Sequence, residues 1–561
     1  MLQEDKNRYC VFWNEDVYAP VITDRFLGEA PSSWTYMATD VRPVFLQEKY
    51  LLSLICPEHF ARCFESSVWA DSSNNFFMDG KKIRLSMNKL LREADKDEIS
   101  QKLHAFVPSE AQKNSERKII QAFCEANKNH FNHIVFSEDL DNEGWPVGAA
   151  PFVKACIEKY PKRTPFVSFS GGKDSTVVSS IVLKALDNPS IIHIFGDTTL
   201  EMPETYEYVN RFQESHDMTP FLTEKNETSD FMQLCKRIGP PSRVKRWCCS
   251  IFKTGPMGTT LADMDLQLLT FYGVRRFESA ARSKYSRVSP SPKLKKQFVA
   301  SPIINWLDID VWLYILTTGI DFNFAYRQGY TRVGCWCCPN NSDWSDSLMA
   351  VWHPSKYGEW HSFLLDFARK IGKADAEIYV RDGKWKARQG GSGLDTRVAQ
   401  INSKDCTAEN NAKLFSLTRP MEESFYEFFK PFGNLEFSIG KKGLSEVFVI
   451  GKQDQLLLKI AGQLGGDQVR IAVLGDLNEE FNSKTLARNI FKYIDRQIRK
   501  YQTCICCQAC NSVCPVSAIT VTGDKYEINE KKCIHCLHCV MHFDDGCLIA
   551  SALSVRKGSV S

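Results

Sequence analysis

The chain has 561 residues, 43% hydrophobic and 24% charged, which suffices for several hydrophobic cores and roughly three or four domains. Lysine and arginine outnumber aspartate and glutamate by only 70 to 67, so net charge gives no general attraction to nucleic acid or to an anionic membrane. No apolar run approaches the ~18 residues that span a bilayer. The start, MLQEDKNRYC, lacks the apolar segment of a signal peptide, so we expect a cytoplasmic protein without membrane contact.

Four segments differ in composition. Residues 1–110 mix short apolar and aromatic runs and predict an accessory α+β domain, and residues 111–400 carry the pattern of an α/β domain. Residues 410–500 predict a small α/β domain in which LEFSI, EVFVIG and RIAVLG are strands, DQLLLKIAGQL is a helix and SKTLARNIFKYIDRQIRKYQ is a linker helix. Residues 501–561 form a cysteine-rich module.

The second segment has a regular order of expected elements. A helical pattern over residues 115–157 precedes the strand PFVSF, the glycine turn SGGKDST and the helix VVSSIVLKAL. A second strand, SIIHIF, leads into the acidic helix start GDTTLEMPETYEYVNRF. Strand, turn, helix, strand and helix in this order predict an α/β fold with a doubly wound parallel sheet, whose site lies at the carboxyl ends of the strands.

The glycine turn has the chemistry of a phosphate-binding loop. Glycine permits close approach of a ligand, and the exposed amides at a helix N-terminus bind phosphate oxygens. The loop lacks the GxxxxGK[ST] spacing of a Walker A motif. The candidate nucleotide-binding residues of the loop are Ser170, Gly171, Gly172, Lys173, Asp174 and Ser175.

A second motif follows the next strand and reads Asp197-Thr198-x-x-Glu201-x-Pro203-Glu204-Thr205. Together with the loop, it resembles the SGGxDS PP-loop and the associated motif of ATP pyrophosphatases and of the phosphoadenosine phosphosulfate (PAPS) reductase family. The resemblance continues through RVKRWCCSIFKTGP at 243–256, YGVRRFESAARS at 272–283, SPIINW at 301–306 and GYTRVGCWCCP at 329–339. It covers roughly residues 120–395 and implies the PP-loop fold of the adenine nucleotide alpha hydrolase type.

The family resemblance implies roles for single residues. Lys173 and the loop amides would contact the nucleotide phosphates, and Asp197, Thr198 and Gly273 would lie near the nucleotide. Arginine binds sulfate or phosphate oxygens through its planar fork, so Arg246, Arg275, Arg276 and Arg282 would line the path of an anionic substrate. The candidate catalytic residues are Lys173, Asp174, Asp197, Arg275, Arg276 and Arg282.

The chain has 21 cysteines, many of them closely grouped, which in a reducing compartment indicates metal binding rather than disulfides. Cys248 with Cys249 and Cys335 with Cys338 resemble the cysteine set that binds a [4Fe-4S] cluster in adenylyl-sulfate (APS) reductases. Four thiolates in two pairs also suit structural zinc, so iron–sulfur and zinc are both interpretations of this site.

Nine further cysteines lie between Cys504 and Cys547. The stretch from Cys504 to Pro515 fits the bacterial ferredoxin spacing C-x2-C-x2-C-x3-C-P, in which the fourth cysteine binds the other cluster. The resemblance implies a ferredoxin-like α+β module with two [4Fe-4S] clusters, and zinc is the alternative. One cluster would be bound by Cys504, Cys507, Cys510 and Cys547, and the other by Cys514, Cys533, Cys536 and Cys539.

Two features separate the chain from typical sulfonucleotide reductases: its loop is intact, and no cysteine follows Cys547. The first hypothesis is therefore adenylation with ATP and Mg²⁺, release of pyrophosphate and displacement of AMP by sulfur or electrons, as in the ATP pyrophosphatase of DNA phosphorothioation. The second is an APS or PAPS reductase that makes sulfite with electrons from its own clusters. The third is a non-catalytic subunit that senses nucleotide or redox state.

These hypotheses name different partners besides the adenine nucleotide. An electron donor protein or flavoprotein would reduce the clusters, and a cysteine desulfurase would supply sulfur. Nucleic acid is a candidate acceptor, which the basic stretch at 283–296 would contact, although a solvated charged loop also explains that stretch.

Overall fold

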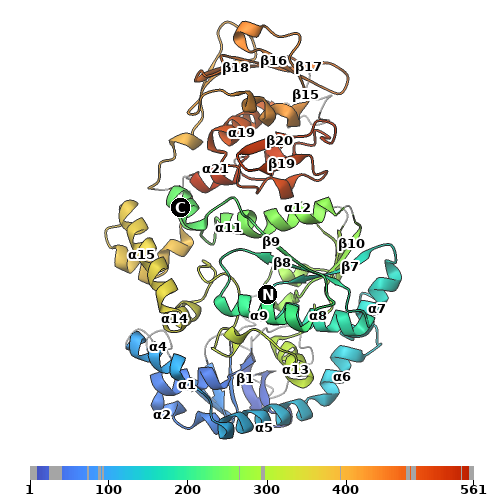
Figure 1. Cartoon of the computed structure of the whole chain (residues 1–561), viewed down its shortest axis with the longest axis vertical. Coiled ribbons are helices and arrows are strands. Elements are labelled where there is room, and N and C mark those ends of the chain that lie inside the picture. Colours follow the sequence, from blue (N-terminus) through green and yellow to red (C-terminus); the bar gives the residue numbers. More distant parts are fainter. Residues whose placement is uncertain are drawn as a thin grey trace. The chain divides into compact units, whose positions relative to one another are not determined.

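The computed structural model describes residues 9–24, 41–71, 75–85, 90, 94–264, 266–291, 297–391, 393–475, 481, 488–544 and 546–554. The chain divides into two compact units. Unit 1 contains residues 1–223 and 266–360, and unit 2 contains residues 224–265 and 361–561. Figure 1 shows the elements of both units, coloured along the sequence.

A six-stranded sheet is the centre of unit 1, in the order β11-β12-β10-β7-β8-β9. Strand β7 pairs in parallel with β8 and with β10, β10 also pairs in parallel with β12, and β11 runs antiparallel to β12. The predicted mixed α/β fold with a largely parallel sheet is therefore confirmed. The strands are β7 (Thr164–Phe169), β8 (Ile192–Asp197), β9 (Phe221–Lys225), β10 (Leu268–Phe271), β11 (Val288–Pro290) and β12 (Gln297–Ala300).

Helices cover this sheet. Helix α8 follows β7 and helix α9 follows β8, and both lie below these strands in the view of Figure 1. Apolar residues of α8, such as Val178 and Val182, belong to the buried core, as does Trp312 of α13. The helices from α5 to α14 in unit 1 are α5 (Glu110–Ala126), α6 (Lys128–Phe136), α7 (Ala149–Lys159), α8 (Lys173–Leu186), α9 (Pro203–Ser215), α13 (Asp308–Thr318) and α14 (Asp343–Trp352), and α15 (Pro354–Lys370) continues into unit 2.

The N-terminal elements share hydrophobic cores with the sheet region of unit 1. Phe45 and Trp69 are buried in the same core as Trp312, and the rings of Phe45 and Trp312 are 5.6 Å apart. A hairpin of β1 (Tyr9–Asn14) and β2 (Ala19–Asp24) is followed by a four-stranded antiparallel sheet. The remaining elements are β3 (Arg42–Pro43), α1 (Leu46–Ile55), α2 (Pro57–Phe60), β4 (Val68–Ala70), β5 (Asn75–Met78), β6 (Lys81–Arg84) and α4 (Lys96–Ala105).

Unit 2 contains a six-stranded antiparallel sheet in the order β13-β14-β18-β17-β16-β15. The helix predicted for DQLLLKIAGQL is wrong, because Leu456–Gly462 form strand β17 between β16 and β18. A short apolar run fits either element, and pairing on both sides decides for a strand. The strands are β13 (Asn402–Asp405), β14 (Ala412–Ser416), β15 (Asn434–Glu436), β16 (Val447–Ile450), β17 (Leu456–Gly462) and β18 (Gln468–Val473).

The cysteine-rich module shares a core with this sheet. Ile494 and Tyr501 of α19, Val449 of β16 and Val521 of β19 are buried in one cluster of side chains. The linker helix predicted before the module is confirmed as α19 over its described part, whereas residues 482–487 lie outside the described residues. The other elements of unit 2 are α10 (Phe231–Ile238), α11 (Trp247–Cys249), α12 (Gly255–Asp263), α16 (Ala376–Arg381), α19 (Ile490–Thr503), β19 (Ile519–Thr522), β20 (Lys525–Ile528), α20 (His538–Met541) and α21 (Leu548–Leu553).

None of the helices in the described part of the chain is both long enough and apolar enough to cross a membrane.

Candidate functional site

Three predicted segments meet at one edge of the unit 1 sheet. The loop follows β7, Asp197 ends β8, and Gly273 comes two residues after β10. These three strands are adjacent and parallel, so their carboxyl ends lie side by side. A Cβ atom on Gly273 would lie only 2.7 Å from the carbonyl carbon of Asp174. Glycine at this position therefore lets the segment after β10 lie directly against the loop.

The loop is held by hydrogen bonds from its surroundings. Gly171 has a φ of 69°, which favours glycine, and its carbonyl accepts a 3.1 Å hydrogen bond from Asn323 Nδ2. The backbone N–H of Lys173 donates to the Tyr326 hydroxyl at 3.0 Å, and the backbone N–H of Ser170 donates to Ser175 Oγ at 3.1 Å. The loop is thus a fixed turn at the N-terminus of α8, where phosphate binding is favoured.

Four charged side chains form a buried network beneath the loop. Lys173 Nζ lies 3.1 Å from Asp174 Oδ2 and 3.0 Å from Asp308 Oδ1. Arg275 bridges the same two carboxylates, with its Nε 2.6 Å from Asp174 Oδ1 and its Nη2 2.5 Å from Asp308 Oδ1. The positive charges of Lys173 and Arg275 balance the negative charges of Asp174 and Asp308. All four side chains can therefore stay charged in the absence of a ligand.

The network shifts the pKa values of its members. Burial alone would lower the pKa of Lys173, but the carboxylates of Asp174 and Asp308 outweigh burial and hold this pKa above its usual range. Burial would raise the pKa of Asp174, yet Lys173 and Arg275 lower it to about 2. Lys173 is therefore an ammonium and Asp174 a carboxylate at neutral pH.

The other predicted arginines have partners of their own. Arg276 forms an ion pair with Glu143 and donates to Asn305 Oδ1 at 2.7 Å. Arg282 pairs with Glu278 four residues earlier. Arg246 is exposed and belongs to unit 2. Of the three predicted arginines in unit 1, only Arg275 bonds to a residue of the loop.

Asp197 lies at the end of β8 with two donors. The Tyr206 hydroxyl and the backbone N–H of Thr199 each donate to Asp197 Oδ1 at 2.7 Å. The hydroxyl of Thr198, which is buried, donates to Glu201 Oε1 at 2.9 Å. The acidic residues of the second motif are thus fixed by hydrogen bonds at the edge that carries the loop.

Cys335 lies beside this second motif. It forms an isolated β-bridge with Glu201, and its Sγ is 3.3 Å from the Thr198 hydroxyl. Cys338 follows within the same turn, because its N–H donates to the Cys335 carbonyl at 3.2 Å. Cys248 and Cys249 lie in unit 2, so the four-cysteine site remains a prediction.

The segment that carries Cys248 and Cys249 packs against the cysteine-rich module within unit 2. Helix α11 contacts α21. The buried amide of Asn226 donates to the Ile251 carbonyl at 3.1 Å and to the Cys507 carbonyl at 3.4 Å, so it links both segments. Lys245 Nζ donates to Ser551 Oγ at 2.7 Å. A π-helical turn, Ser250–Thr254, directly follows the two cysteines.

The eight predicted ligands of the module line two separate cavities. Each cavity combines three cysteines of one tight group with one cysteine from elsewhere, as the crossover pattern of the sequence predicts. The first is lined by Cys504, Cys507, Cys510 and Cys547, together with Cys506, Lys500 and Tyr526. The second is lined by Cys514, Cys533, Cys536 and Cys539.

The two cysteine loops share an unusual backbone. Cys506 and Gln508 have positive φ angles of 52° and 64°, two and four residues after Cys504. His535 and Leu537 have positive φ angles of 50° and 57°, two and four residues after Cys533. Non-glycine residues adopt this conformation rarely, and backbone turns of this kind form concave anion sites, including those for iron–sulfur clusters. The repeated geometry fits two anionic groups of the same kind.

The thiols of the module are poor anions on their own. Burial raises the pKa of Cys510 to about 11 and that of Cys539 to about 12, in spite of the nearby Lys500. Metal coordination requires thiolates and releases their protons when the metal binds. Four cysteines at each cavity therefore fit the two [4Fe-4S] clusters that the resemblance implies, and they also fit zinc, the alternative.

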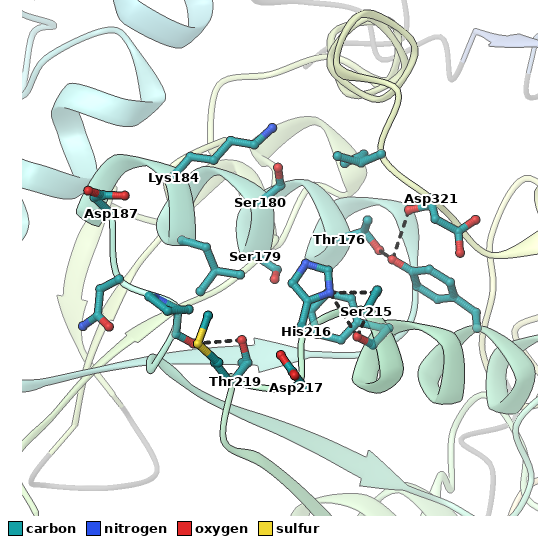
Figure 2. A pocket seen from close by; sticks show the side chains of 17 residues that line it. Thr176, Ser179, Ser180, Lys184, Asp187, Ser215, His216, Asp217, Thr219 and Asp321 are labelled. Atoms are coloured by element: carbon teal, nitrogen blue, oxygen red, sulfur yellow. Dashed lines mark hydrogen bonds between the residues drawn. The ribbon is translucent and has the colours of Figure 1, made fainter.

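A cavity of about 590 Å³ also lies along α8 and α9, away from the charged network. Figure 2 shows its lining, in which polar groups bond to one another. The Tyr208 hydroxyl is 2.8 Å from Thr176 Oγ1, and Ser215 Oγ is 2.9 Å from His216 Nδ1. These groups stabilise the walls and do not converge on a ligand, so we assign no function to this cavity.

Comparisons with known proteins identify the central region. Residues 164–341 match the model of the phosphoadenosine phosphosulfate reductase domain. The chain is 30% identical to the uncharacterized protein MJ0066 of Methanocaldococcus jannaschii over 298 residues, 50% of this chain and 61% of that protein. It spans 51% of a second relative from the same organism, MJ0973, to which it is 30% identical over 39% of its own length.

Two further matches concern proteins with described activities. An adenosine 5'-phosphosulfate reductase from Staphylococcus epidermidis is 24% identical over 244 residues, 42% of this chain and 96% of that enzyme. A crystal structure of PAPS reductase from Candida auris is 17% identical, with a TM-score of 0.26 over 36% of this chain and 98% of that one. Residues 164–341 thus match a phosphoadenosine phosphosulfate reductase domain, and the chain spans between half and two thirds of the length of the first two relatives.

Proposed function

We propose that the chain binds ATP at the loop of residues 170–175, adenylates an oxygen of its substrate and then transfers sulfur to the activated position. The substrate oxygen would attack the α-phosphorus of ATP, and the bond to the β-phosphate oxygen would break, releasing pyrophosphate. The outer sulfur of a persulfide donor would then displace AMP, which joins donor and product through an S–S bond. Two electrons, delivered one at a time through the clusters, would break that bond and release the donor thiol and the thiolated product. The observation that carries this proposal is the charged network of Lys173, Asp174, Arg275 and Asp308 at an intact PP-loop.

The network suits a pyrophosphate leaving group. Lys173 and Arg275 can donate to phosphate oxygens, which carry growing charge as the pyrophosphate leaves. Asp174 and Asp308 would repel a triphosphate unless a cation lay between them, and carboxylates are the usual protein ligands of Mg²⁺. Bound Mg²⁺ would offset the charge of the phosphates. With a magnesium-bound triphosphate, the two cations of the network would contact phosphate oxygens and the two carboxylates would contact Mg²⁺.

The cysteine sets add redox chemistry to this reaction. When bound, [4Fe-4S] clusters in the module would supply one-electron transfer. Asn226 bonds to the carbonyls of both Ile251 and Cys507, and α11 contacts α21, which supports an electron route from the module toward Cys248 and Cys249. An electron donor protein and a sulfur donor would be the partners of such a reaction.

Reduction of APS or PAPS to sulfite is the second candidate. The match of the chain to 96% of the length of an adenosine 5'-phosphosulfate reductase favours it. In that reaction two electrons would break the bond between sulfur and the bridging phosphate oxygen, leaving sulfite and the nucleotide. In this candidate reaction the chain would draw these electrons from its clusters. A sensing subunit without catalysis has no observation in its favour.

Anaerobic incubation of the reduced protein with ATP, APS or PAPS in separate tubes distinguishes the two reactions. ATP would be tested together with Mg²⁺, a persulfide donor and an acceptor pool of transfer RNA or DNA, and the products would be separated by chromatography. We expect AMP and pyrophosphate to form in the tube with ATP, and no sulfite to form in the tubes with APS or PAPS. Sulfite from APS or PAPS, together with no turnover of ATP, would overturn adenylation and establish the reductase.

A further inference from the structure

Lys500 is a buried lysine that has no ion-pair partner among the described residues. It lies on α19 with 1% of its surface exposed, and its Nζ donates to the Tyr526 hydroxyl at 3.0 Å. No carboxylate of the described residues forms an ion pair with it, and Lys500 lines the first cysteine cavity together with Cys510 and Tyr526. Burying an ammonium group is costly unless opposite charge compensates it.

The position of Lys500 relates it to both cysteine sets. Cys510 lines the first cavity and Cys539 lines the second, and the Lys500 ammonium interacts with the sulfur atoms of both. Tyr526 holds the ammonium in place, and its own ring stacks on Phe428 with centroids 4.7 Å apart. Burial and the hydrogen bond to Tyr526 thus keep the Lys500 ammonium beside the first cavity, away from water.

We propose that Lys500 is a fixed cation shared by the two clusters and that it raises the reduction potential of both. This inference rests on the proposed two-cluster assignment. A [4Fe-4S] cluster with four thiolates is an anion, and its negative charge increases by one when it accepts an electron from a low-potential one-electron donor. A cation nearby favours the reduced form over the oxidised form, most strongly in a buried site. Lys500 would thus act on the clusters through its fixed positive charge and would not itself take part in electron transfer.

The role can be tested by redox titration of the holoprotein, followed by electron paramagnetic resonance. Lys500→Met removes the charge and keeps the length of the side chain, whereas Lys500→Arg keeps the charge. Lys492→Met removes an exposed lysine from the same helix and is the matched control. For Lys500→Met we expect a tenfold or larger shift toward the oxidised form in both clusters, which is about 59 mV for one electron. Lys500→Arg and Lys492→Met should stay close to the parent protein.

The outcomes separate this inference from the assignment on which it rests. Parent protein that contains zinc or no iron would overturn the two-cluster assignment. Parent protein with two clusters, together with unchanged potentials in Lys500→Met, would overturn the role of Lys500 alone. If Lys500→Met does not retain iron, the same redox titration is made on Lys500→Gln. This variant keeps a hydrogen-bond donor for Tyr526 but carries no charge. Unchanged reduction potentials in Lys500→Gln would overturn the role of Lys500.

Discussion

The charged network at the loop and the cysteine-rich module satisfy their buried charges in different ways. At the loop, Lys173 and Arg275 are paired with Asp174 and Asp308, and the charges cancel within the protein. In the module, Lys500 has no carboxylate partner among the described residues, and the thiols beside it favour their neutral form. The charges of the first site are balanced by protein groups alone, whereas under the proposed assignment an anionic metal cluster would balance the charge of the second.

This difference predicts that removal of the metal destabilises the module and leaves the stability of the loop region unchanged. It is the largest effect that we expect. Oxidative loss of iron followed by chelation should leave buried thiols and an uncompensated ammonium, and structural metal sites contribute directly to folding. Hydrogen exchange should speed up strongly in α19, β19 and β20, while β7 and β8 keep their protection. If α19, β19 and β20 exchanged their amide hydrogens equally slowly with and without metal, the module would not depend on metal for its stability.

Lys173→Ala tests the loop side. Loss of the ammonium removes a donor to the phosphates, so we expect nucleotide turnover to fall by about 100-fold or more while the iron content stays unchanged. The matched control is Lys184→Ala, which removes an exposed lysine from the same helix, α8. Normal turnover in Lys173→Ala would overturn the role of the loop.

Asp308→Asn weakens the compensation within the network. Removing one charge of a buried ion-pair network typically costs about 3 kcal/mol, so the free energy of unfolding of unit 1 should decrease by about that amount. Asp321→Asn is the control, because the Asp321 side chain is 60% exposed in its ion pair with Arg211 and should change stability by about 0.5 kcal/mol or less. Chemical denaturation would measure both; similar values for the two variants would argue against a tightly coupled network.

The smallest expected effect concerns the pair of His130 and Asp310 in unit 1. A 2.8 Å hydrogen bond to the Asp310 carboxylate raises the pKa of His130 above its ordinary value of 6.5. The stabilisation is therefore fully present below pH 6.5 and is lost as the pH rises through the higher value of the folded protein. Because the His130 side chain is 47% exposed, the effect should stay below about 1 kcal/mol.

Denaturation of the parent protein and of His130→Gln measures this effect. The difference in unfolding free energy should be larger at about pH 5.5 than at about pH 9, where the histidine is neutral in both states. The same difference at both pH values would show that the ion pair contributes nothing.

Sequence patterns predicted the elements whose motifs are local. The strand before the loop, the helix after it and the strand before Asp197 all occur as β7, α8 and β8, because turn glycines and apolar periodicity determine them over short distances. The sequence failed at Leu456–Gly462, where pairing with two distant strands makes a strand of an apolar run. Tertiary pairing of this kind leaves no local signal.

The candidate sites were predictable to different degrees. The resemblance to two-cluster ferredoxins grouped Cys547 with a triplet more than 30 residues earlier, and the two cavities have the same grouping. Asp308 and Tyr326 were missed, because they reach the loop only through the packing of α13 and of the turn after it. The stretch SPIINW two residues before Asp308 was the only local signal there. Of the basic stretch at 283–296, residues 292–296 lie outside the described residues.

Equilibrium binding of nucleotides tests the central claim most directly, because it needs no acceptor. Calorimetric titration of the anaerobic protein with ATP, with and without Mg²⁺, and with APS would be compared with the same titrations of Lys173→Ala. The account predicts Mg²⁺-dependent binding of ATP that weakens at least about tenfold in Lys173→Ala, the loss expected for one charge-assisted contact. Binding of APS with no detectable binding of ATP would contradict it.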